Sequence, residues 1–550
     1  MMRGLMQDRP LTIPGLLTRA ETSFGHKRVI TGGAEESVAT WGEIAPRVRR
    51  LAHAIEALEV PPGACVGTFA WNSQRHMELY LAVPSSGRIL HTVNHRLHGE
   101  QISFIVNDAA DDILFVDRTI MPVVWPLIAS FTSVRHVVVM DDGGDFPLPD
   151  DQRILDYEEL LRDQPDTPIE TVIDDERTAA SLCYTSGTTG NPKGVLYSHR
   201  SVVLHSLLLL GADVFALSES DVVAPIVPMF HVNAWGLPYA AMQCGADLVL
   251  PGPATAPAEL ADLLSRHRVT FSAAVATVWR NLLPELDGYD LGSLRHLVCG
   301  GGAVDDALSL AYETAIGLPL SNAWGMTETS PVVTTARLGT AHGGLSADES
   351  RQVLGTPGPA VPLTEIRIMS DDDVEQPRDG TSPGELQVAG ATIASAYFGA
   401  DRGTESFTAD GWLRTGDVAT IDRWGHLRIV DRTKDLVKSG GEWISSVELE
   451  NAIMSHPEVR EAAVIGLADP RWGERPLACL VTDPGVTLTI DDLRQHLRGR
   501  VASWWIPEHI EQLDEIPTTA TGKWSKQSLR QRFAGTTSPV VTEDDVRERT

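Results

Sequence analysis

The sequence contains few lysines, few cysteines and no long hydrophobic run. Lysine accounts for only six of its 45 basic residues. The five cysteines form no C-x-x-C pair, so they predict reduced, buried thiols rather than a disulfide framework or a zinc site. No uninterrupted apolar run reaches about 18 residues, the length that a membrane-spanning helix needs. The longest apolar candidate, residues 202–217, contains His205 and Asp213 and predicts a buried helix.

Acidic residues far outnumber basic ones. The formal net charge of −29 excludes nonspecific binding to nucleic acid, because such a chain is repelled by the phosphate backbone. Anionic substrates must therefore be captured at local positive sites. The N-terminus carries no apolar signal core, and together with the reduced cysteines this predicts a cytoplasmic protein. The sequence leaves open whether the protein is a monomer or a homodimer.

Strand-like and helix-like segments alternate along most of the chain. This alternation predicts α/β layers with largely parallel sheets. The expected strands are 64–70, 113–117, 136–140, 222–227, 246–250, 269–274 and 294–299, and the expected helices among them are 259–267 and 305–316. Between residues 365 and 429, short strands separated by Gly, Pro and Asp turns predict a small β unit.

A second unit follows a boundary that we place at residues 431–434. Helices at 446–455 and 490–500 and strands at 460–467 and 478–481 predict a smaller α+β domain. The predicted organisation is a large N-terminal domain over residues 1–431, a mobile C-terminal domain over 432–535 and a disordered polar tail over 536–550.

Residues 184–194, Tyr-Thr-Ser-Gly-Thr-Thr-Gly-Asn-Pro-Lys-Gly, are the most informative segment of the chain. They follow an apolar run, residues 179–184, that predicts a buried strand. Glycine and small hydroxyl residues let backbone N–H groups approach an anion closely, and Lys193 adds a positive charge. The segment does not match the Walker A pattern. It favours a polyphosphate site over a flexible surface loop, which the same residue types also form.

The rare lysines support a phosphate site independently. A compact, mobile ammonium is not reproduced by arginine. Five of the six lysines fall in or beside short segments of this kind, and their concentration there favours function over chance. They are Lys193, Lys434, Lys438, Lys523 and Lys526.

Further short segments follow the first loop in a fixed order. They are Gly-Gly-Gly-Ala (300–303), Trp-Gly-Met-Thr-Glu (324–328), Thr-Gly-Asp (415–417), Asp-Arg-Thr-Lys-Asp (431–435), Lys-Ser-Gly-Gly-Glu (438–442) and a Thr-Gly-Lys that ends at 523. The ordered set resembles the adenylate-forming superfamily, which includes acyl-CoA synthetases, carrier-protein adenylation domains and beetle luciferases. The resemblance covers roughly residues 10 to 535. It implies ATP and CoA as co-substrates, Mg²⁺ as a cofactor, and a small domain that rotates about a hinge.

The resemblance assigns most of a nucleotide site. Asp417 is expected to accept hydrogen bonds from the ribose hydroxyls, although a turn aspartate can also cap its own backbone. Trp324 stands where the family more often has tyrosine, so stacking on adenine is kept and a hydroxyl is lost. The other expected nucleotide contacts are Thr185, Ser186, Gly187, Thr188, Thr189, Gly190, Lys193, Gly301, Gly302, Ala303, Asn322, Ala323, Thr327, Arg432 and Lys434.

Two residues are expected at a metal ion. Glu328 offers the hard oxygen ligand that Mg²⁺ prefers, and the resemblance adds Thr185. The alternative for Glu328 is a solvated loop glutamate.

Two segments of the small domain are expected to serve different half-reactions. Lys523 resembles the lysine that bridges the substrate carboxylate and the α-phosphate, an electrostatic role. The second glycine-rich loop, with Lys438, Gly440, Gly441 and Trp443, is similar to the loop that meets the active site after rotation and admits the pantetheine of CoA. This division of the chemistry gives a reason for a hinge.

Residues 229–235, Met-Phe-His-Val-Asn-Ala-Trp, point to the acyl site. His231 resembles the aromatic residue beside the acyl carbonyl and is expected to take part in catalysis. Trp235 lies on the same face if the segment is helical, and it resembles the gate of a fatty-acyl channel. Gly302 would complete the acyl site. Both His231 and Trp235 have an alternative as ordinary core residues.

Together these features predict an ATP-dependent acid–thiol ligase that converts a medium- or long-chain fatty acid to acyl-AMP and then to acyl-CoA. The alternatives are an aryl or alicyclic carboxylate–CoA ligase and a fatty acyl-AMP ligase that loads a carrier protein. A catalytically idle regulator that binds acyl nucleotides is a further alternative. The joint presence of Lys523, Glu328 and Asp417 argues against it.

Overall fold

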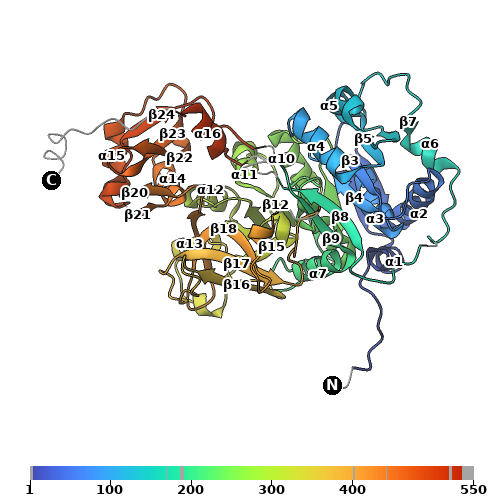
Figure 1. Ribbon diagram of the computed structural model, residues 1–550, viewed down its shortest axis with the longest axis horizontal. Coiled ribbons are helices and arrows are strands. Elements are labelled where there is room, and N and C mark those ends of the chain that lie inside the picture. Colours follow the sequence, from blue (N-terminus) through green and yellow to red (C-terminus); the bar gives the residue numbers. More distant parts are fainter. Residues whose placement is uncertain are drawn as a thin grey trace.

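The computed structural model describes residues 4–169, 171–185, 191–399, 403–440, 442–519 and 523–534. Within them, two large sheets form the main body, a four-stranded sheet follows, and a five-stranded sheet forms a smaller unit at one end of the molecule (Figure 1). The predicted fold class, layered α/β followed by a small β unit and a smaller α+β unit, is confirmed.

The first large sheet has the strand order β15-β14-β13-β12-β10-β11-β1-β2. In this order, each strand from β13 to β1 pairs in parallel with the next one. These strands consist mainly of apolar residues, as expected for a parallel sheet that is covered by helices on both faces. The strands are β1 (Arg28–Thr31), β2 (Ser37–Thr40), β10 (Val222–Pro225), β11 (Asp247–Leu250), β12 (Phe271–Val275), β13 (His296–Gly300), β14 (Leu320–Gly325) and β15 (Val332–Thr335).

The second large sheet has the order β7-β6-β5-β3-β4-β8-β9 and is parallel except for the β8–β9 pair. Strand β8 carries the chain into the predicted phosphate loop, and its bounds are those expected from the sequence. The strands are β3 (Cys65–Phe69), β4 (Ile89–Thr92), β5 (Ile113–Asp117), β6 (His136–Met140), β7 (Ile154–Asp156), β8 (Ala179–Tyr184) and β9 (Gly194–Ser198).

Helices cover these sheets and fill the space between them. The α-helices of the main body are α1 (Ile13–Phe24), α2 (Trp41–Ala57), α3 (Gln74–Ser85), α4 (Gly99–Ala109), α5 (Met121–Val124), α6 (Tyr157–Arg162), α7 (His199–Leu209), α8 (Val232–Trp235), α9 (Leu237–Cys244), α10 (Pro257–Arg266), α11 (Ala276–Leu282), α12 (Asp306–Ile316) and α13 (Ala347–Gly355). The 3₁₀ helices of the chain are η1 (Arg118–Ile120), η2 (Trp125–Ser130), η3 (Leu283–Glu285), η4 (Thr327–Thr329), η5 (Thr340–His342), η6 (Thr404–Ser406) and η7 (Ser503–Trp505).

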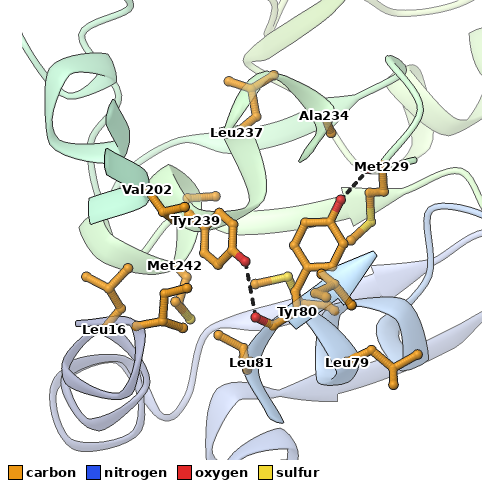
Figure 2. Packing of buried hydrophobic residues seen from close by; sticks show 14 of the residues in the cluster. Leu16, Leu79, Tyr80, Leu81, Val202, Met229, Ala234, Leu237, Tyr239 and Met242 are labelled. Carbon is orange, nitrogen blue, oxygen red and sulfur yellow. Dashed lines mark hydrogen bonds between the residues drawn. The ribbon is translucent and has the colours of Figure 1, made fainter. Parts of the chain in front are cut away.

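The two large sheets share one hydrophobic core through helices α1, α3, α7 and α9. Two buried tyrosines tie this core together (Figure 2). The hydroxyl of Tyr239 donates to the carbonyl of Tyr80 at 3.1 Å, and the hydroxyl of Tyr80 donates to the carbonyl of Met229. Because Met229 is the first residue of the predicted acyl segment, this core fixes where that segment begins.

The smaller sheets come from the last third of the chain. The four-stranded antiparallel sheet contains β16 (Thr364–Met369), β17 (Gly384–Gly390), β18 (Leu413–Ile421) and β19 (Leu427–Arg432). The terminal unit contains β20 (Val437–Ser439), β21 (Glu442–Ile444), β22 (Val459–Asp469), β23 (Gly473–Thr482), β24 (His509–Gln512), α14 (Ser446–Met454), α15 (Ile490–Leu497) and α16 (Lys526–Arg532).

One expected helix is shorter than predicted. Helix α7 begins at His199, where Ser198 caps it, and ends at Leu209 rather than near residue 217. The chain turns at Gly211, whose N–H donates to the carbonyl of Leu208. No helix in the described part of the chain has the length and apolarity needed to span a bilayer. The predicted tail, residues 536–550, lies outside the described residues.

Candidate active site

A cavity of about 490 Å³ opens where the carboxyl ends of β12, β13 and β14 meet the β18–β19 sheet and the end of the small unit. Ligands of open α/β sheets bind at this end of the strands. The lining residues that the sequence predicted are Thr185, His231, Trp235, Gly301, Ala323, Trp324, Thr327, Glu328, Arg432, Lys434 and Lys523. Segments spread over more than 300 residues of sequence therefore converge on one cavity.

Asp417 is held at the cavity by two side chains. The indole N–H of Trp324 donates to Oδ2 of Asp417 at 2.9 Å, and Nε of Arg432 lies 3.2 Å from Oδ1. Asp417 is 4% exposed. The register explains the arrangement, since Asp417 of β18 lies opposite Arg432 of β19. The tryptophan that replaces the family's usual tyrosine thus keeps a polar partner, which the sequence did not reveal.

Glu328, in η4, is a buried carboxylate with one oxygen already engaged. The hydroxyl of Tyr397 donates to its Oε1 at 2.6 Å. Burial, followed by the charge of Glu328, raises the pKa of Tyr397, so this phenol remains a donor. Tyr397 also lies under Lys193, whose Nζ is 4.7 Å from the ring centroid. Sequence reasoning missed Tyr397, because it lies 69 residues from Glu328.

The two ends of the predicted phosphate loop pair with each other. The N–H of Thr185 donates to the carbonyl of Lys193 at 2.9 Å, and the N–H of Lys193 donates to Oγ1 of Thr185 at 3.2 Å. Lys193 Nζ lies 3.3 Å from Glu405. Between these ends, Ser186, Gly187, Thr188, Thr189 and Gly190 lie outside the described residues.

Lys523 reaches the cavity beside Gly301. A Cβ placed on Gly301, where φ is +78°, would be 2.9 Å from Cε of Lys523 and 3.4 Å from Nζ, so only glycine leaves room for the lysine. Burial, and then the charge of Arg432, lower the pKa of Lys523 to about 8, although Asp417 and Glu328 act in the opposite direction. The ammonium is thus positioned near two carboxylates without being fully neutralised.

His231 is neutral at this site. Burial, and then the charge of Lys523, lower its pKa to about 3. A neutral imidazole can donate or accept a hydrogen bond without adding charge next to an acyl group.

The segment after His231 is not the right-handed helix assumed from the spacing. Val232, Asn233, Ala234 and Trp235 have φ values between +48° and +57°, which form a left-handed turn that costs about 1–2 kcal/mol per residue. The helical argument for a shared face is therefore wrong, yet His231 and Trp235 do line the same cavity.

Tertiary contacts hold this turn in place. Oγ of Ser181 donates to Oδ1 of the buried Asn233 at 3.2 Å. Gly236 follows with φ +74°, and a Cβ there would lie 2.6 Å from Nδ1 of His205. The ring of Trp235 packs under Gly300, where a Cβ would lie 2.7 Å from Cη2. Trp235 is 6% exposed and lines the cavity together with the apolar side chains of Val232 and Val275.

Some predicted residues lie outside the cavity. Gly302 and Ala303 are exposed beside it. Asn322 is a buried residue of β14 itself, and its Nδ2 donates to the carbonyl of Gly355 at 3.0 Å. Its Oδ1 has no hydrogen-bond partner among the residues that the structure describes.

The second glycine-rich loop lies in the small unit, on the β20–β21 hairpin. Nζ of Lys438 lies 4.4 Å from the ring centroid of Trp443. Gly440, with φ +63°, sits against Trp472, whose Cε3 would lie 2.9 Å from an added Cβ. Gly441 lies outside the described residues. None of the described residues of this hairpin lines the cavity that Lys523 enters.

Comparison with known proteins identifies the family. Residues 17–398 match the model of the AMP-binding enzyme, and residues 448–523 match the model of the AMP-binding enzyme C-terminal domain. The chain therefore belongs to the AMP-binding enzyme family, as the ordered segments predicted.

Relatives match over nearly the whole chain. A long-chain-fatty-acid–CoA ligase from Thermus thermophilus is 43% identical over 96% of both chains. A 3-methylmercaptopropionyl-CoA ligase from Ruegeria lacuscaerulensis is 40% identical over 97% of this chain and 99% of its own. Among solved structures, the anthranilate CoA ligase AuaEII in complex with anthranoyl-AMP superposes with a TM-score of 0.85 at 26% identity, covering 96% of this chain and 99% of that one.

Proposed function

We propose that this protein is an ATP-dependent fatty acyl-CoA ligase for medium- to long-chain acids. The observation that carries the proposal is the entry of Lys523 into one cavity with Glu328 and His231, close enough to Asp417 for that carboxylate to raise the pKa of the lysine. Relatives at about 40% identity over the full chain are acyl-CoA ligases. In the first half-reaction a substrate carboxylate oxygen attacks the α-phosphorus of ATP and pyrophosphate leaves. In the second, the CoA thiol attacks the acyl carbonyl and AMP leaves.

Lys523 stabilises the negative charge that develops between the carboxylate and the α-phosphate. Its pKa of about 8 leaves it mostly protonated at pH 7, and its partly buried position strengthens its effect on a nearby anion. Asp417, fixed by Trp324 and Arg432, keeps acceptor capacity on both oxygens for the ribose hydroxyls.

The residues present fit a magnesium ion that would be coordinated both by protein oxygens and by the phosphates of the nucleotide. Mg²⁺ takes one or two protein oxygens and completes its shell with water and phosphate. Glu328 and Thr185 provide such oxygens, and the described residues contain no cluster of three or more His, Cys, Asp or Glu side chains that would form an all-protein site. When bound, the ion would neutralise phosphate charge, and Tyr397, which donates to Oε1 of Glu328, would hold that carboxylate in place.

The acyl group would enter beside His231 and Trp235. Trp235 occupies the apolar end of the cavity under Gly300, and a longer chain requires it to move. Trp235 is therefore the proposed gate of an acyl channel. A short acid such as 3-methylthiopropionate would need less of this movement, and the relative with that acyl group in its name makes it the second candidate.

A panel of acids tests the proposal. ATP–pyrophosphate exchange and CoA thioester formation are measured with 3-methylthiopropionate, decanoate, palmitate and benzoate. We expect the highest kcat/KM with decanoate or palmitate. Preference for benzoate would favour an aryl-CoA ligase, and adenylate without thioester would favour an acyl-AMP ligase that loads a carrier protein. Loss of exchange with every acid would contradict an enzymatic role.

A further inference from the structure

Buried polar contacts join the end of strand β19 to helices α14 and α16. Oδ2 of Asp431 accepts from the N–H of Ser446 at 2.6 Å and from its hydroxyl at 2.5 Å. Nζ of Lys526 donates to the same hydroxyl oxygen at 2.6 Å and lies 2.7 Å from Oε1 of Glu450. We call Asp431, Ser446, Glu450 and Lys526 the junction cluster.

The polar groups of the junction cluster interact mainly with one another. Asp431, Ser446 and Glu450 are at most 5% exposed, so its groups depend on one another rather than on water. Burial raises the pKa of Glu450 to about 7 even though Lys526 opposes this. Burial alone would lower the pKa of Lys526, but Glu450 and Asp431 raise it. Lys526 is therefore charged. It forms an ion pair with Glu450 and is also attracted by the charge of Asp431.

The cluster spans two parts of the chain that belong to different sheets. Asp431 is fixed in the four-stranded sheet, where it lies opposite Val418, and the next residue, Arg432, lies opposite Asp417 at the cavity. Ser446 and Lys526 belong to helices of the small unit.

Helix α16 also contacts the segment that joins the two units. Arg530 of α16 lies 2.7 Å from Oδ1 of Asp435 and donates to the carbonyl of Lys434 at 3.2 Å. Helix α16 is thus tied to both sides of the segment that joins the two units.

Helix α16 also determines where Lys523 lies. Lys523 stands three residues before Lys526, and its own backbone is held by the turn at Thr519, whose N–H donates to the carbonyl of Lys523 at 2.6 Å. Anchoring Lys526 to Asp431 therefore fixes the start of α16 relative to the sheet that carries Asp417. The result is a continuous path of contacts from the predicted ribose site to the adenylation lysine.

We propose that Asp431, Ser446 and Lys526 are positioning residues that hold Lys523 in the cavity for adenylation and must separate before the β20–β21 loop can reach it. This inference rests on the proposed two-step function. A rotation about residues 432–434 leaves Asp431 in its sheet but carries Ser446 and Lys526 away with the small unit. Contacts that exist in just one of the two orientations shift the population of molecules toward that orientation.

Two substitutions weaken the cluster with little change in volume. Asp431→Asn removes the charge that attracts Lys526, and Ser446→Ala removes the hydroxyl that links Asp431 to Lys526. The matched control is Leu493→Ala, which opens a cavity in the hydrophobic core of the small unit without touching the cluster. Each variant is assayed for ATP–pyrophosphate exchange with decanoate and for thioester formation from supplied decanoyl-AMP and CoA, below its melting temperature.

We expect both cluster variants to lose about tenfold in exchange, which corresponds to about 1.4 kcal/mol, and to keep or gain thioester formation. Leu493→Ala should lower Tm and leave the ratio of the two rates unchanged. An unchanged ratio in Ser446→Ala would overturn the positioning role, and this variant decides the question if Asp431→Asn does not fold. Wild-type protein without exchange on any acid would instead overturn the proposed function.

Discussion

Two lysines of the small unit differ in their surroundings, since one enters the cavity and the other is exposed to solvent. Lys523 reaches the cavity beside Gly301, Asp417 and Glu328, and its pKa falls to about 8. Lys438 is exposed on the β20–β21 hairpin and stacks on Trp443, away from that cavity. Lys523 follows Gly522 and Lys438 lies two residues before Gly440, so local sequence alone does not distinguish them. The difference supports our proposal that one orientation of the small unit presents Lys523 for adenylation and that another brings the hairpin to the cavity for thioester formation.

The largest expected effect comes from removing the lysine on the cavity side. Lys523→Ala should lower ATP–pyrophosphate exchange by about 10²–10³-fold, the usual cost of losing a charge-stabilising donor. Thioester formation from supplied acyl-AMP should change little, because we expect that step to depend on the β20–β21 hairpin instead. Exchange at the wild-type rate would refute the role of Lys523.

The reverse effect is expected on the hairpin side. Gly440→Leu forces a side chain into a left-handed backbone and against Trp472, and misplacing the loop by about 1 Å can cost about 10²-fold in thioester formation. Pyrophosphate exchange should be retained. Gly485→Leu is the control, since Gly485 also has a positive φ of +84° but has nothing within 4 Å of an added Cβ.

The two half-reactions should also differ in pH dependence. Adenylation needs protonated Lys523, so exchange should be full below its pKa of about 8 and fall by about tenfold per pH unit above it. Thioester formation from acyl-AMP should not follow that decline. Exchange and thioester rates measured between pH 6.5 and 9.5 check this, and parallel profiles would contradict it.

A smaller effect is expected from the phenol that holds Glu328. Tyr397→Phe removes a hydrogen bond to a carboxylate, and such bonds are worth about 1.5–3 kcal/mol. We expect the Mg²⁺ concentration for half-maximal exchange to rise about tenfold or less, with KM for CoA unchanged. A titration of Mg²⁺ identical to that of the wild type would remove Tyr397 from the metal site.

The smallest change in overall rate is expected at Trp235. Trp235→Ala leaves a cavity that costs about 3–5 kcal/mol of stability in a packed core, so folding is checked by Tm first. In the folded variant, KM for palmitate should fall relative to KM for 3-methylthiopropionate, and KM for ATP should stay constant. Lower stability with an unaltered chain-length profile would make Trp235 an ordinary core residue.

The sequence predicted much of this arrangement because the relevant signals are local. Strand β8 was bounded correctly by its apolar run, and the order of the short segments identified the family. The left-handed turn at 232–235 was not predictable, since Asn233 is held by Ser181 and Gly236 is confined by His205, both distant in sequence. The roles of Tyr397 and of the indole N–H of Trp324 likewise depend on partners brought close only by folding. The cytoplasmic location stays a prediction, and the oligomeric state stays open.

The central claim, that one small unit presents two different segments for two half-reactions, has one direct test. Acyl-AMP formation from decanoate and ATP, and thioester formation from decanoyl-AMP and CoA, are measured in single-turnover experiments on Lys523→Ala and Gly440→Leu prepared side by side. The account predicts crossed results, with the first variant failing only in acyl-AMP formation and the second only in thioester formation. Parallel losses in both half-reactions for both folded variants would contradict it.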